Sequence, residues 1–165
     1  MRLSHLVATV GHVGHLRPAP GTWGSLAALP LAWALHALAG PWLLALAALA
    51  AFAAGWWATA RETAGQDDPD PSVIVIDEVA GQWIAFLPVS IGAVWAGAPL
   101  TALWPGWIAA FVLFRLFDIL KPGWVGRADR RGDALGVMLD DVVAGIFAAL
   151  GVVLLAALSH GVMAL

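Results

Sequence analysis

Charged residues are confined almost entirely to two short segments of this 165-residue chain. The chain has 8 Lys and Arg and 11 Asp and Glu, and seven of these residues lie in 61–78 and ten in 115–141. Residues 18–60, 79–114 and 142–165 contain none of them. Because an unpaired charge is costly inside hydrocarbon, long uncharged stretches between polar segments are typical of a chain that crosses a bilayer. The pattern therefore predicts that the polar chemistry of this protein is gathered at a membrane surface.

The composition agrees with a membrane protein. Hydrophobic residues make up 61% of the chain and charged residues 12%, whereas soluble domains have about 45–50% and about 25%. A soluble but unusually apolar helical bundle is the alternative. The net charge of −3 argues against a nucleic-acid partner, because phosphate backbones are bound by clustered Lys and Arg. With no Cys in the chain, disulfides and thiolate metal sites are excluded.

The first uncharged stretch predicts a helical hairpin. About 20 apolar residues are needed for one helix to cross the hydrocarbon core, and residues 18–60 provide about twice that length. The dipeptide Gly40-Pro41 near the middle favours a turn. We therefore expect helices over about residues 25–39 and 42–60, and the sequence leaves open whether the first arm crosses fully.

The other uncharged stretches predict a second hairpin and a final helix. Residues 79–114 are interrupted by GAP at 97–99 and by PG at 105–106, so we expect a turn between two helices there. Residues 142–157 are expected to form one more helix. The sequence thus predicts one all-α domain over residues 1–165, a membrane-embedded multi-helix bundle with about five hydrophobic helices in hairpins and polar segments on one face.

The hairpins also predict an orientation in the membrane. A hairpin returns the chain to the side from which it left, so the N-terminal segment and residues 61–78 and 115–141 should share one side. All eight Lys and Arg lie in these parts of the chain. Because positively charged residues favour the cytoplasmic side of a membrane, we expect this side to be cytoplasmic.

Acidic residues from three segments meet the predicted membrane boundary on that side. They are Asp77, Glu78, Asp118, Asp140 and Asp141. A cluster of carboxylate oxygens suits a hard divalent cation, especially Mg²⁺. Purely structural roles are the alternative, because Asp77 could cap a helix and Asp118 could pair with Arg115 or Lys121, three residues away. Asp140-Asp141 is harder to explain in this way, because the two side chains diverge by about 100° on a helix.

Basic and hydroxyl residues offer candidate phosphate ligands. Arg115 and Lys121 flank Asp118, and their charged groups could hold a phosphate. Attraction to anionic lipid headgroups is the preferred interpretation for the three later arginines, which are Arg127, Arg130 and Arg131. Thr22 and Ser25 lie among glycines ahead of an apolar run, where they could bind an anion at a helix start or act only as caps.

Three histidines near the N-terminus form a further candidate group. His12 and His15 could suggest a pair of metal ligands, with His5 nearby in the sequence. They lie in a glycine-rich stretch with no carboxylate close to them in the sequence, so the sequence does not favour a metal site there.

A small membrane transporter of ions or protons is the competing class of function, and a structural membrane subunit is a third class. Charged side chains in transporters usually lie at mid-depth on several helices. In this chain they gather at one surface, which favours an enzyme that acts on a lipid headgroup.

Four segments together resemble the phosphatidylglycerophosphatase A family. They are APGTWGSL at 19–26, DEVAGQWI at 77–84, FRLFDILKP at 114–122 and LGVMLDDVVAG at 135–145. Their order and spacing carry the resemblance, which covers most of the chain. It implies an all-helical fold and a Mg²⁺-dependent lipid phosphatase of the bacterial inner membrane. Such an enzyme would convert phosphatidylglycerophosphate to phosphatidylglycerol and phosphate.

The resemblance and the residue chemistry together suggest a role for each candidate. The expected Mg²⁺ ligands are Glu78, Asp118, Asp140 and Asp141. Asp77 is expected to be a further ligand or the general base, and Asp141 and Lys121 are also expected to act in catalysis. The expected phosphate-binding residues are Thr22, Ser25, Arg115 and Lys121. An aspartyl-phosphate intermediate is an open alternative to attack by water. Residues 123–134 depart from the family pattern, and no role is carried over to them.

Overall fold

The computed structural model describes the backbone of residues 2–163 and the side chains of residues 2–159. Every regular element in this part of the chain is helical, which confirms the all-α prediction. The α-helices are α1 (Leu3–Ala8), α2 (Pro20–Glu62), α3 (Ile76–Trp95), α4 (Trp104–Leu120), α5 (Trp124–Asp129) and α6 (Ala134–Met163), and the 3₁₀ helices are η1 (Val13–His15) and η2 (Leu100–Leu103).

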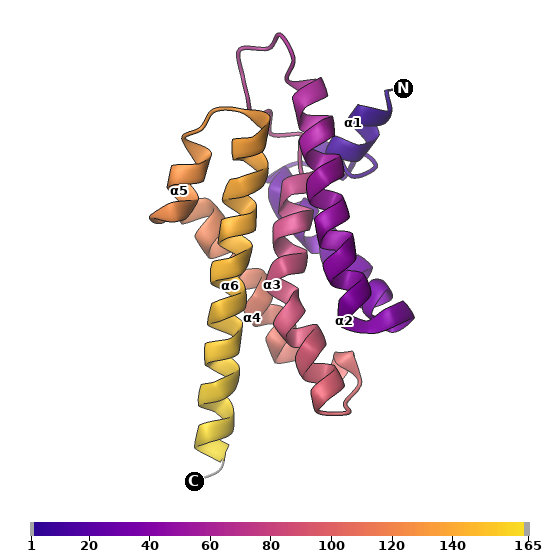
Figure 1. Cartoon of the computed structure of the whole chain (residues 1–165), viewed down its shortest axis with the longest axis vertical. Coiled ribbons are helices and arrows are strands. Elements are labelled where there is room, and N and C mark those ends of the chain that lie inside the picture. The colour runs from indigo at the N-terminus through magenta and orange to yellow at the C-terminus, as the bar shows by residue number, and fades with distance from the viewer. Residues whose placement is uncertain (1, 164–165) are drawn as a thin grey trace.

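Helix α2 is broken at Gly40-Pro41, as the sequence predicts. Ala39 (φ −153°, ψ 28°) and Gly40 (φ 66°, ψ −158°) leave the helical region, and Pro41 has no N–H with which to continue the helix. The two arms of α2 therefore meet at a bend (Figure 1). The first arm begins at Pro20, five residues earlier than expected, because Pro is favoured in the first turn of a helix.

The second hairpin forms between α3 and α4, with one correction to the prediction. Gly97, which follows α3, has a φ of 59°, a left-handed conformation that glycine adopts readily. Pro105 lies in the first turn of α4, where its missing N–H costs nothing. Residues 105–106 therefore begin a helix and do not interrupt one.

Helix α6 begins at Ala134, eight residues before the predicted start. The uncharged stretch marked only the apolar part of this helix. The Oδ1 of Asp133 accepts a hydrogen bond of 2.7 Å from the N–H of Gly136, which satisfies one of the free donors at the helix start. As a result, Asp140 and Asp141 lie about two turns into α6 and not ahead of it.

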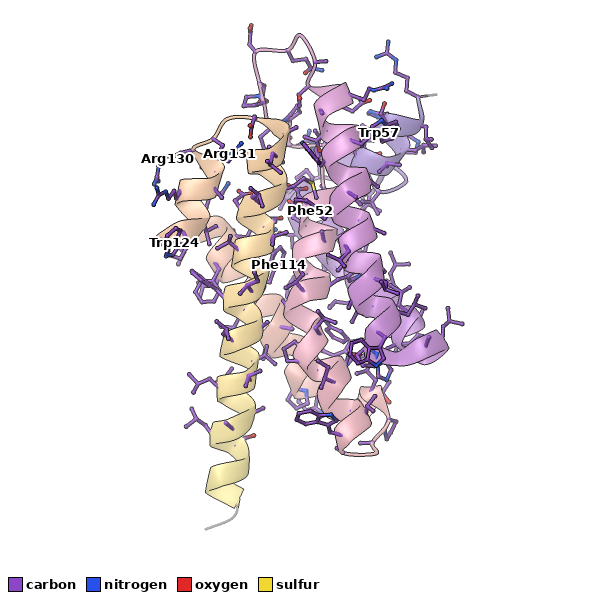
Figure 2. All side chains as sticks on the ribbon, in the orientation of Figure 1. Phe52, Trp57, Phe114, Trp124, Arg130 and Arg131 are labelled. Atoms are coloured by element: carbon purple, nitrogen blue, oxygen red, sulfur yellow. The ribbon has the colours of Figure 1, made fainter. Side chains whose placement is uncertain are left out.

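The polar segments lie at one end of the molecule, as predicted. Figure 1 shows the N-terminus, the loop between α2 and α3, and the connection from α5 to α6 at this end. The C-terminal end of α6 and the turn after α3 lie at the opposite end. The labelled side chains of Trp57, Arg130 and Arg131 in Figure 2 lie toward the polar end.

Four helical segments within the described residues are long and apolar enough to cross a membrane. They are Pro20–Glu62, Ile76–Trp95, Leu100–Leu120 and Ala134–Ser159. Because α2 is bent, these segments provide five hydrophobic arms. Their outward faces carry large apolar side chains, such as Leu46 on α2 and Leu150 on α6, each of which is 63% exposed. An apolar exterior of this kind suits contact with lipid.

Two glycines allow α3 and α6 to cross at close range. A Cβ on Gly81 would lie 2.6 Å from the carbonyl oxygen of Asp141, and a Cβ on Gly145 would overlap the carbonyl oxygen of Gly81. Small residues permit this approach between helix backbones. Gly81 and Gly145 follow Asp77 and Asp141 by four residues, so each glycine shares a helix face with one acidic residue. The crossing therefore brings the two acidic residues together.

Candidate active site

Three carboxylates from α3 and α6 converge at the polar end of the molecule. Asp77, Glu78 and Asp141 each place one carboxylate oxygen within 4.8 Å of the other two. Asp77 is only 7% exposed and Asp141 only 2%. Asp77 Oδ1, Glu78 Oε2 and Asp141 Oδ2 are buried without a hydrogen-bond partner among the described residues. Because buried charged oxygens are costly unless they are paired or bind a metal, this cluster has the donor chemistry of a cation site.

The start of α3 favours acidic residues at these positions. Helix α3 begins at Ile76, so Asp77 and Glu78 lie in its first turn. The partial positive charge at a helix N-terminus stabilises carboxylates there. This local effect helps to hold two adjacent acidic side chains at a depth where solvent is largely excluded.

Arg115 of α4 connects the acidic cluster to the first turns of α2. Its Nη1 donates a hydrogen bond to Asp118 Oδ2, lies 3.9 Å from Glu78 Oε1 and donates to Ser25 Oγ at 3.4 Å. Ser25 Oγ in turn donates to the carbonyl oxygen of Gly21 at 2.9 Å. The Nε of Arg115 is buried with no partner in the described part of the chain, so one guanidinium donor is free for a ligand.

The backbone of α2 lies directly against this group. A Cβ on Gly21 would lie 2.0 Å from Glu78 Oε1 and 3.2 Å from Arg115 Nη1. Thr22, the next residue, is half-buried, and its backbone N–H donates to the carbonyl oxygen of Ala19 at 3.0 Å. The first turn of α2 therefore forms one wall of the site.

Lys121 lies on the other side of the site, at the C-terminal end of α4. Its backbone is left-handed (φ 46°, ψ 52°), and its Nζ donates to Asp140 Oδ2 at 2.7 Å and to Asp129 Oδ1. Burial lowers the pKa of Lys121, but the hydrogen bonds to Asp129 and Asp140 outweigh this effect and raise the pKa above its usual value. Lys121 is therefore a cation at neutral pH.

The structure places the predicted site residues in three neighbouring groups. The first group contains Asp77, Glu78 and Asp141, each of which has one unpartnered oxygen, whereas Asp118 is bonded to Arg115 and Asp140 is bonded to Lys121. The side chains of Asp140 and Asp141 diverge as expected for neighbours on a helix. Asp140 Oδ1 also accepts the backbone N–H of Asp141 at 3.0 Å. The roles of Asp118 and Asp140 as metal ligands, like the other assigned roles, stay predictions.

The sequence pattern does not identify two residues that the structure places at the site, Gly21 and Asp129. Gly21 was treated only as part of a glycine-rich helix start, although its position inside the APGTWGSL segment was a signal. Asp129 lies in α5, beyond the proline that ends α4, and no periodicity relates it to Lys121. The path of the chain after Lys121 brings the Asp129 carboxylate to the ammonium group of Lys121, and this path cannot be read from the spacing of the residues.

The charges of the site do not balance within the protein. Six carboxylates lie in the three groups, and Arg115 and Lys121 supply two positive charges. The acidic residues are Asp77, Glu78, Asp118, Asp129, Asp140 and Asp141. A phosphate group would add further negative charge and would be repelled by this surplus. A bound divalent cation would remove the conflict.

Comparison with known proteins identifies the family. A family model described as phosphatidylglycerophosphatase A matches residues 6–156. A phosphatidylglycerophosphatase A of Haemophilus influenzae is 37% identical over 145 residues, which cover 87% of this chain and 83% of that protein. A phosphatidylglycerophosphatase A of Escherichia coli is 35% identical over 149 residues, which cover 88% of this chain and 78% of that protein.

A third relative carries a different name. It is a protein of Bacteroides thetaiotaomicron, provisionally named a phosphatidylinositol-3-phosphatase, which is 40% identical over 136 residues that cover 78% of each chain. No solved structure matches this chain at a significant level. The family match extends over the whole candidate site, from the first turn of α2 to the acidic turn of α6. The chain belongs to the phosphatidylglycerophosphatase A family.

Proposed function

We propose that this protein is a Mg²⁺-dependent phosphatase that hydrolyses phosphatidylglycerophosphate to phosphatidylglycerol and phosphate in the bacterial inner membrane. Its family membership makes it a phosphatase, and the substrate is that of the two relatives named for this activity. The observation that carries the metal-dependent chemistry is the group of three buried, unpartnered carboxylate oxygens within 4.8 Å of one another.

The donor set fits Mg²⁺ well. Asp77, Glu78 and Asp141 offer only hard oxygen atoms, which Mg²⁺ prefers. Each has one oxygen that is buried and lacks a partner among the described residues. When bound, Mg²⁺ would supply positive charge that draws electron density from the phosphoryl oxygens. Asp118 and Asp140 are further candidate ligands, and each would have to share its carboxylate with the cation that now contacts it.

Arg115 is positioned to bind the substrate phosphate beside the acidic cluster. Its side chain is 15% exposed, and its Nη1 lies within 3.9 Å of Glu78. The unpartnered Nε is a free donor, and a guanidinium group binds phosphate through paired N–H donors. Thr22 lies in the first turn of α2 and can donate its hydroxyl to the phosphate. Ser25 accepts from the same guanidinium at 3.4 Å and donates to the Gly21 carbonyl at 2.9 Å, so its hydroxyl would have to turn away from Gly21 to donate to the phosphate.

Asp77 and Lys121, on opposite sides of the site, are the candidates for accepting a proton and for stabilising the leaving group. If Asp77 is not itself a ligand of the ion, its buried, unpartnered Oδ1 can accept a proton from the attacking water as general base. Lys121 is held by Asp129 and Asp140 and can stabilise the negative charge that develops on the leaving glycerol oxygen. Attack by a carboxylate to give an aspartyl-phosphate would use the same residues for phosphate binding.

The proposal includes an orientation in the membrane. The five hydrophobic arms would span or enter the bilayer, with the polar end at the headgroup level. Because all Lys and Arg of the chain lie in segments at that end, the distribution of positive charge favours the cytoplasmic side for the active site. A lipid substrate would then present its phosphate to the site without leaving the membrane.

Phosphate release from the purified protein in detergent–lipid micelles tests the proposal directly. We expect release from phosphatidylglycerophosphate that requires Mg²⁺, stops with EDTA and returns when Mg²⁺ is restored. Asp141→Asn should reduce the rate by more than about 100-fold. Arg131→Ala is the control, because Arg131 is exposed and its ion pair among the described residues is with Asp133. Full activity in EDTA, or in Asp141→Asn, would overturn the proposed metal site.

A phosphoinositide is the second candidate substrate. The Bacteroides relative, which is named for a phosphoinositide substrate, is 40% identical to this chain over 136 residues. The ratio of kcat/KM for phosphatidylglycerophosphate and phosphatidylinositol 3-phosphate decides between the two. A ratio below one would assign the protein to the second activity while leaving the phosphatase chemistry intact. Membership of a phosphatase family argues against the transporter alternative.

A further inference from the structure

A second group of metal-binding side chains lies in the N-terminal segment, outside the candidate active site. His5 lies in α1, His15 in η1 and His12 in the turn between them. Each places one ring nitrogen within 4.8 Å of the other two, and the ring centroids are 5.2 to 6.0 Å apart. We propose that these three histidines bind a Zn²⁺ ion, which ties the N-terminal segment to the end of α2.

The separation of two of the ligand atoms suits tetrahedral Zn²⁺. The Nε2 of His5 lies 3.1 Å from the Nε2 of His15. Two nitrogens on a tetrahedral Zn²⁺, each about 2.0–2.1 Å from the ion, are about 3.3–3.4 Å apart. Only a small movement of these rings would therefore be needed to admit the ion. The exposed side of the cluster, at His12 and His15, leaves room for a fourth ligand such as water.

Glu62 orients the ring of His5 for metal binding. The Nδ1 of His5 lies 3.0 Å from Glu62 Oε2, and Ser4 Oγ donates to Glu62 Oε1 at 2.6 Å. Because a carboxylate accepts hydrogen bonds, the proton of His5 belongs on Nδ1, and the lone pair of Nε2 then points toward His15. Histidine ligands of metals commonly donate their second N–H to a carboxylate in this way. Glu62 is 57 residues from His5 in the chain, so spacing in the sequence does not predict this partner.

The backbone turns sharply to bring His12 and His15 back to His5. Val10, Gly11 and His12 have φ values of 48°, 61° and 75°. A left-handed conformation is rare for a β-branched residue such as Val. The turn is held by Thr9, whose Oγ1 accepts the N–H of His12 at 3.1 Å and donates to the carbonyl oxygen of His5 at 2.7 Å. A conformation of this kind persists only where its surroundings enforce it, and such places are often functional.

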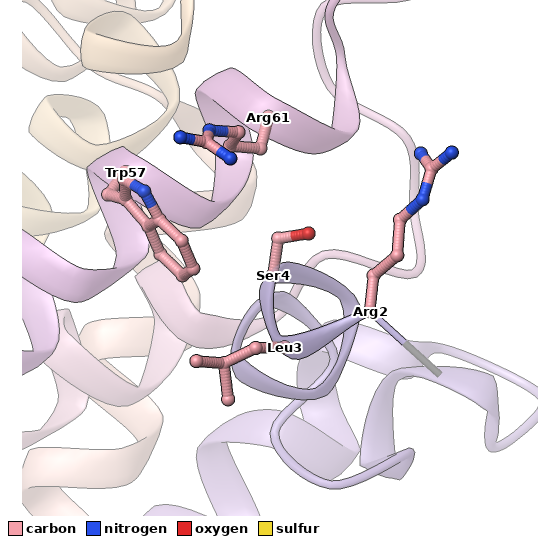
Figure 3. Close-up of a pocket in the computed structure, with 5 residues that line it drawn as sticks. All are labelled: Arg2, Leu3, Ser4, Trp57 and Arg61. Carbon is pink, nitrogen blue, oxygen red and sulfur yellow. The ribbon is translucent and has the colours of Figure 1, made fainter.

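The cluster lies between two parts of the fold that an ion would connect. On one side, α1 lies at the end of α2, and Figure 3 shows Leu3 and Ser4 near Trp57 and Arg61. Together with Arg2, these residues line a cavity of about 430 Å³. On the other side, the carbonyl oxygen of Ala8 accepts the N–H of Val75 at 2.9 Å. Because Val75 directly precedes α3, the ion would also stiffen the segment that leads to Asp77 and Glu78.

The two sites should prefer different ions. Neutral imidazole nitrogens suit Zn²⁺ and related transition metals, whereas carboxylate oxygens suit Mg²⁺. The cluster of His5, His12 and His15 offers three nitrogens, and the active-site group offers only oxygens. Zn²⁺ binding at the N-terminal segment can therefore be measured in the presence of excess Mg²⁺, which occupies the acidic site.

The test uses full-length protein in detergent with a purification tag that contains no histidine. Co²⁺ serves as a coloured substitute for Zn²⁺, and calorimetry in excess Mg²⁺ measures Zn²⁺ directly. We expect one tight Zn²⁺ per chain and a visible Co²⁺ spectrum typical of tetrahedral nitrogen ligands. The His12→Ala/His15→Ala double variant, at two exposed positions, should weaken Zn²⁺ binding more than 100-fold, and Glu62→Gln about 10–100-fold.

Two controls separate the N-terminal cluster from other sites. His160→Ala changes a histidine near the opposite end of the chain, and Asp141→Asn changes the acidic site, so both should retain the Co²⁺ spectrum. Saturation with Zn²⁺ should raise the thermal midpoint of the wild-type protein and leave that of the double variant unchanged. Equal Zn²⁺ affinity in the wild-type protein and the double variant, or loss of the spectrum in Asp141→Asn, would overturn the proposal.

Discussion

Replacement of Gly21 by Ala should damage the active site without harming the fold. The new Cβ would lie 2.0 Å from Glu78 Oε1, whereas ordinary contacts begin at about 3.4 Å. The atom in its way is the end of a flexible side chain and not backbone, so the Glu78 carboxylate can move by about 1.4 Å to relieve the overlap. The movement takes Glu78 away from its position beside Asp77 and Asp141.

The expected loss of activity follows from the size of this displacement. A misplacement of about 1 Å at a reacting centre costs about 100-fold in rate, or about 2.7 kcal/mol of transition-state stabilisation. The Mg²⁺ concentration needed for half-maximal activity should rise about 10–100-fold, because one ligand no longer reaches the ion. Stability should change in the opposite direction, because Ala is favoured over Gly in a helix by about 1 kcal/mol.

Gly92→Ala provides the matched control for this experiment. Gly92 is also helical, but a Cβ there would meet nothing within 4 Å. Both variants should unfold at temperatures equal to or above that of the wild-type protein, and only Gly21→Ala should lose phosphate release and Mg²⁺ affinity. If Gly21→Ala kept wild-type kinetics at limiting Mg²⁺, the position of Glu78 would be irrelevant to catalysis, and the metal site would need another set of ligands.

Three further predictions concern the ends and the crossing of the helices. Lys121→Met should lower kcat about 100–1,000-fold. Burial lowers the pKa of Lys121, but its hydrogen bonds outweigh this effect and raise the pKa. Lys121 is therefore charged at any pH below the usual lysine pKa of about 10.4. Wild-type protein and Lys121→Arg should therefore share one pH–activity profile up to about pH 10. Gly145→Ala should lower the free energy of unfolding by about 1–3 kcal/mol, because the new Cβ at position 145 would overlap the carbonyl oxygen of Gly81. Thermal unfolding measures this change. Asp133→Ala should lower the thermal midpoint by removing a helix cap. A hydrogen bond from Arg131 lowers the pKa of Asp133, so this effect should persist as pH falls to about 4 and vanish only as pH falls through the lowered pKa.

The helix breaks could be predicted because single residue types determine them. Glycine readily adopts the positive φ found at Gly40 and Gly97, and Pro41 cannot continue a helix. The start of α6 could not be predicted in the same way. Hydropathy marks where a helix becomes apolar, whereas the helix itself begins at the Asp133 cap, in a polar segment.

The convergence of the acidic residues was predictable, but their pairing was not. Hairpins place Asp77, Glu78 and Asp141 at the same end of the bundle, so their proximity follows from topology. Which carboxylates are free depends on the direction of α5, which brings Asp129 to Lys121, and on the divergence of the two neighbouring aspartates of α6. The same reasoning did not reveal that Glu62 of α2 lies beside His5, because the two residues are far apart in the sequence.

The ends of three helices act on the charges of the site. Helices α2 and α3 both begin at the site, and their N-termini direct partial positive charge toward Glu78 and toward a bound phosphate. Helix α4 ends there, and Lys121, which follows its last residue, supplies a cation where the helix dipole is negative. The N-termini of α2 and α3 therefore offset part of the acidic charge, and Lys121 offsets the negative end of α4. Reversal of α2 or α3 would place a negative helix end against the acidic cluster, so the hairpin topology is itself part of the electrostatics of the site.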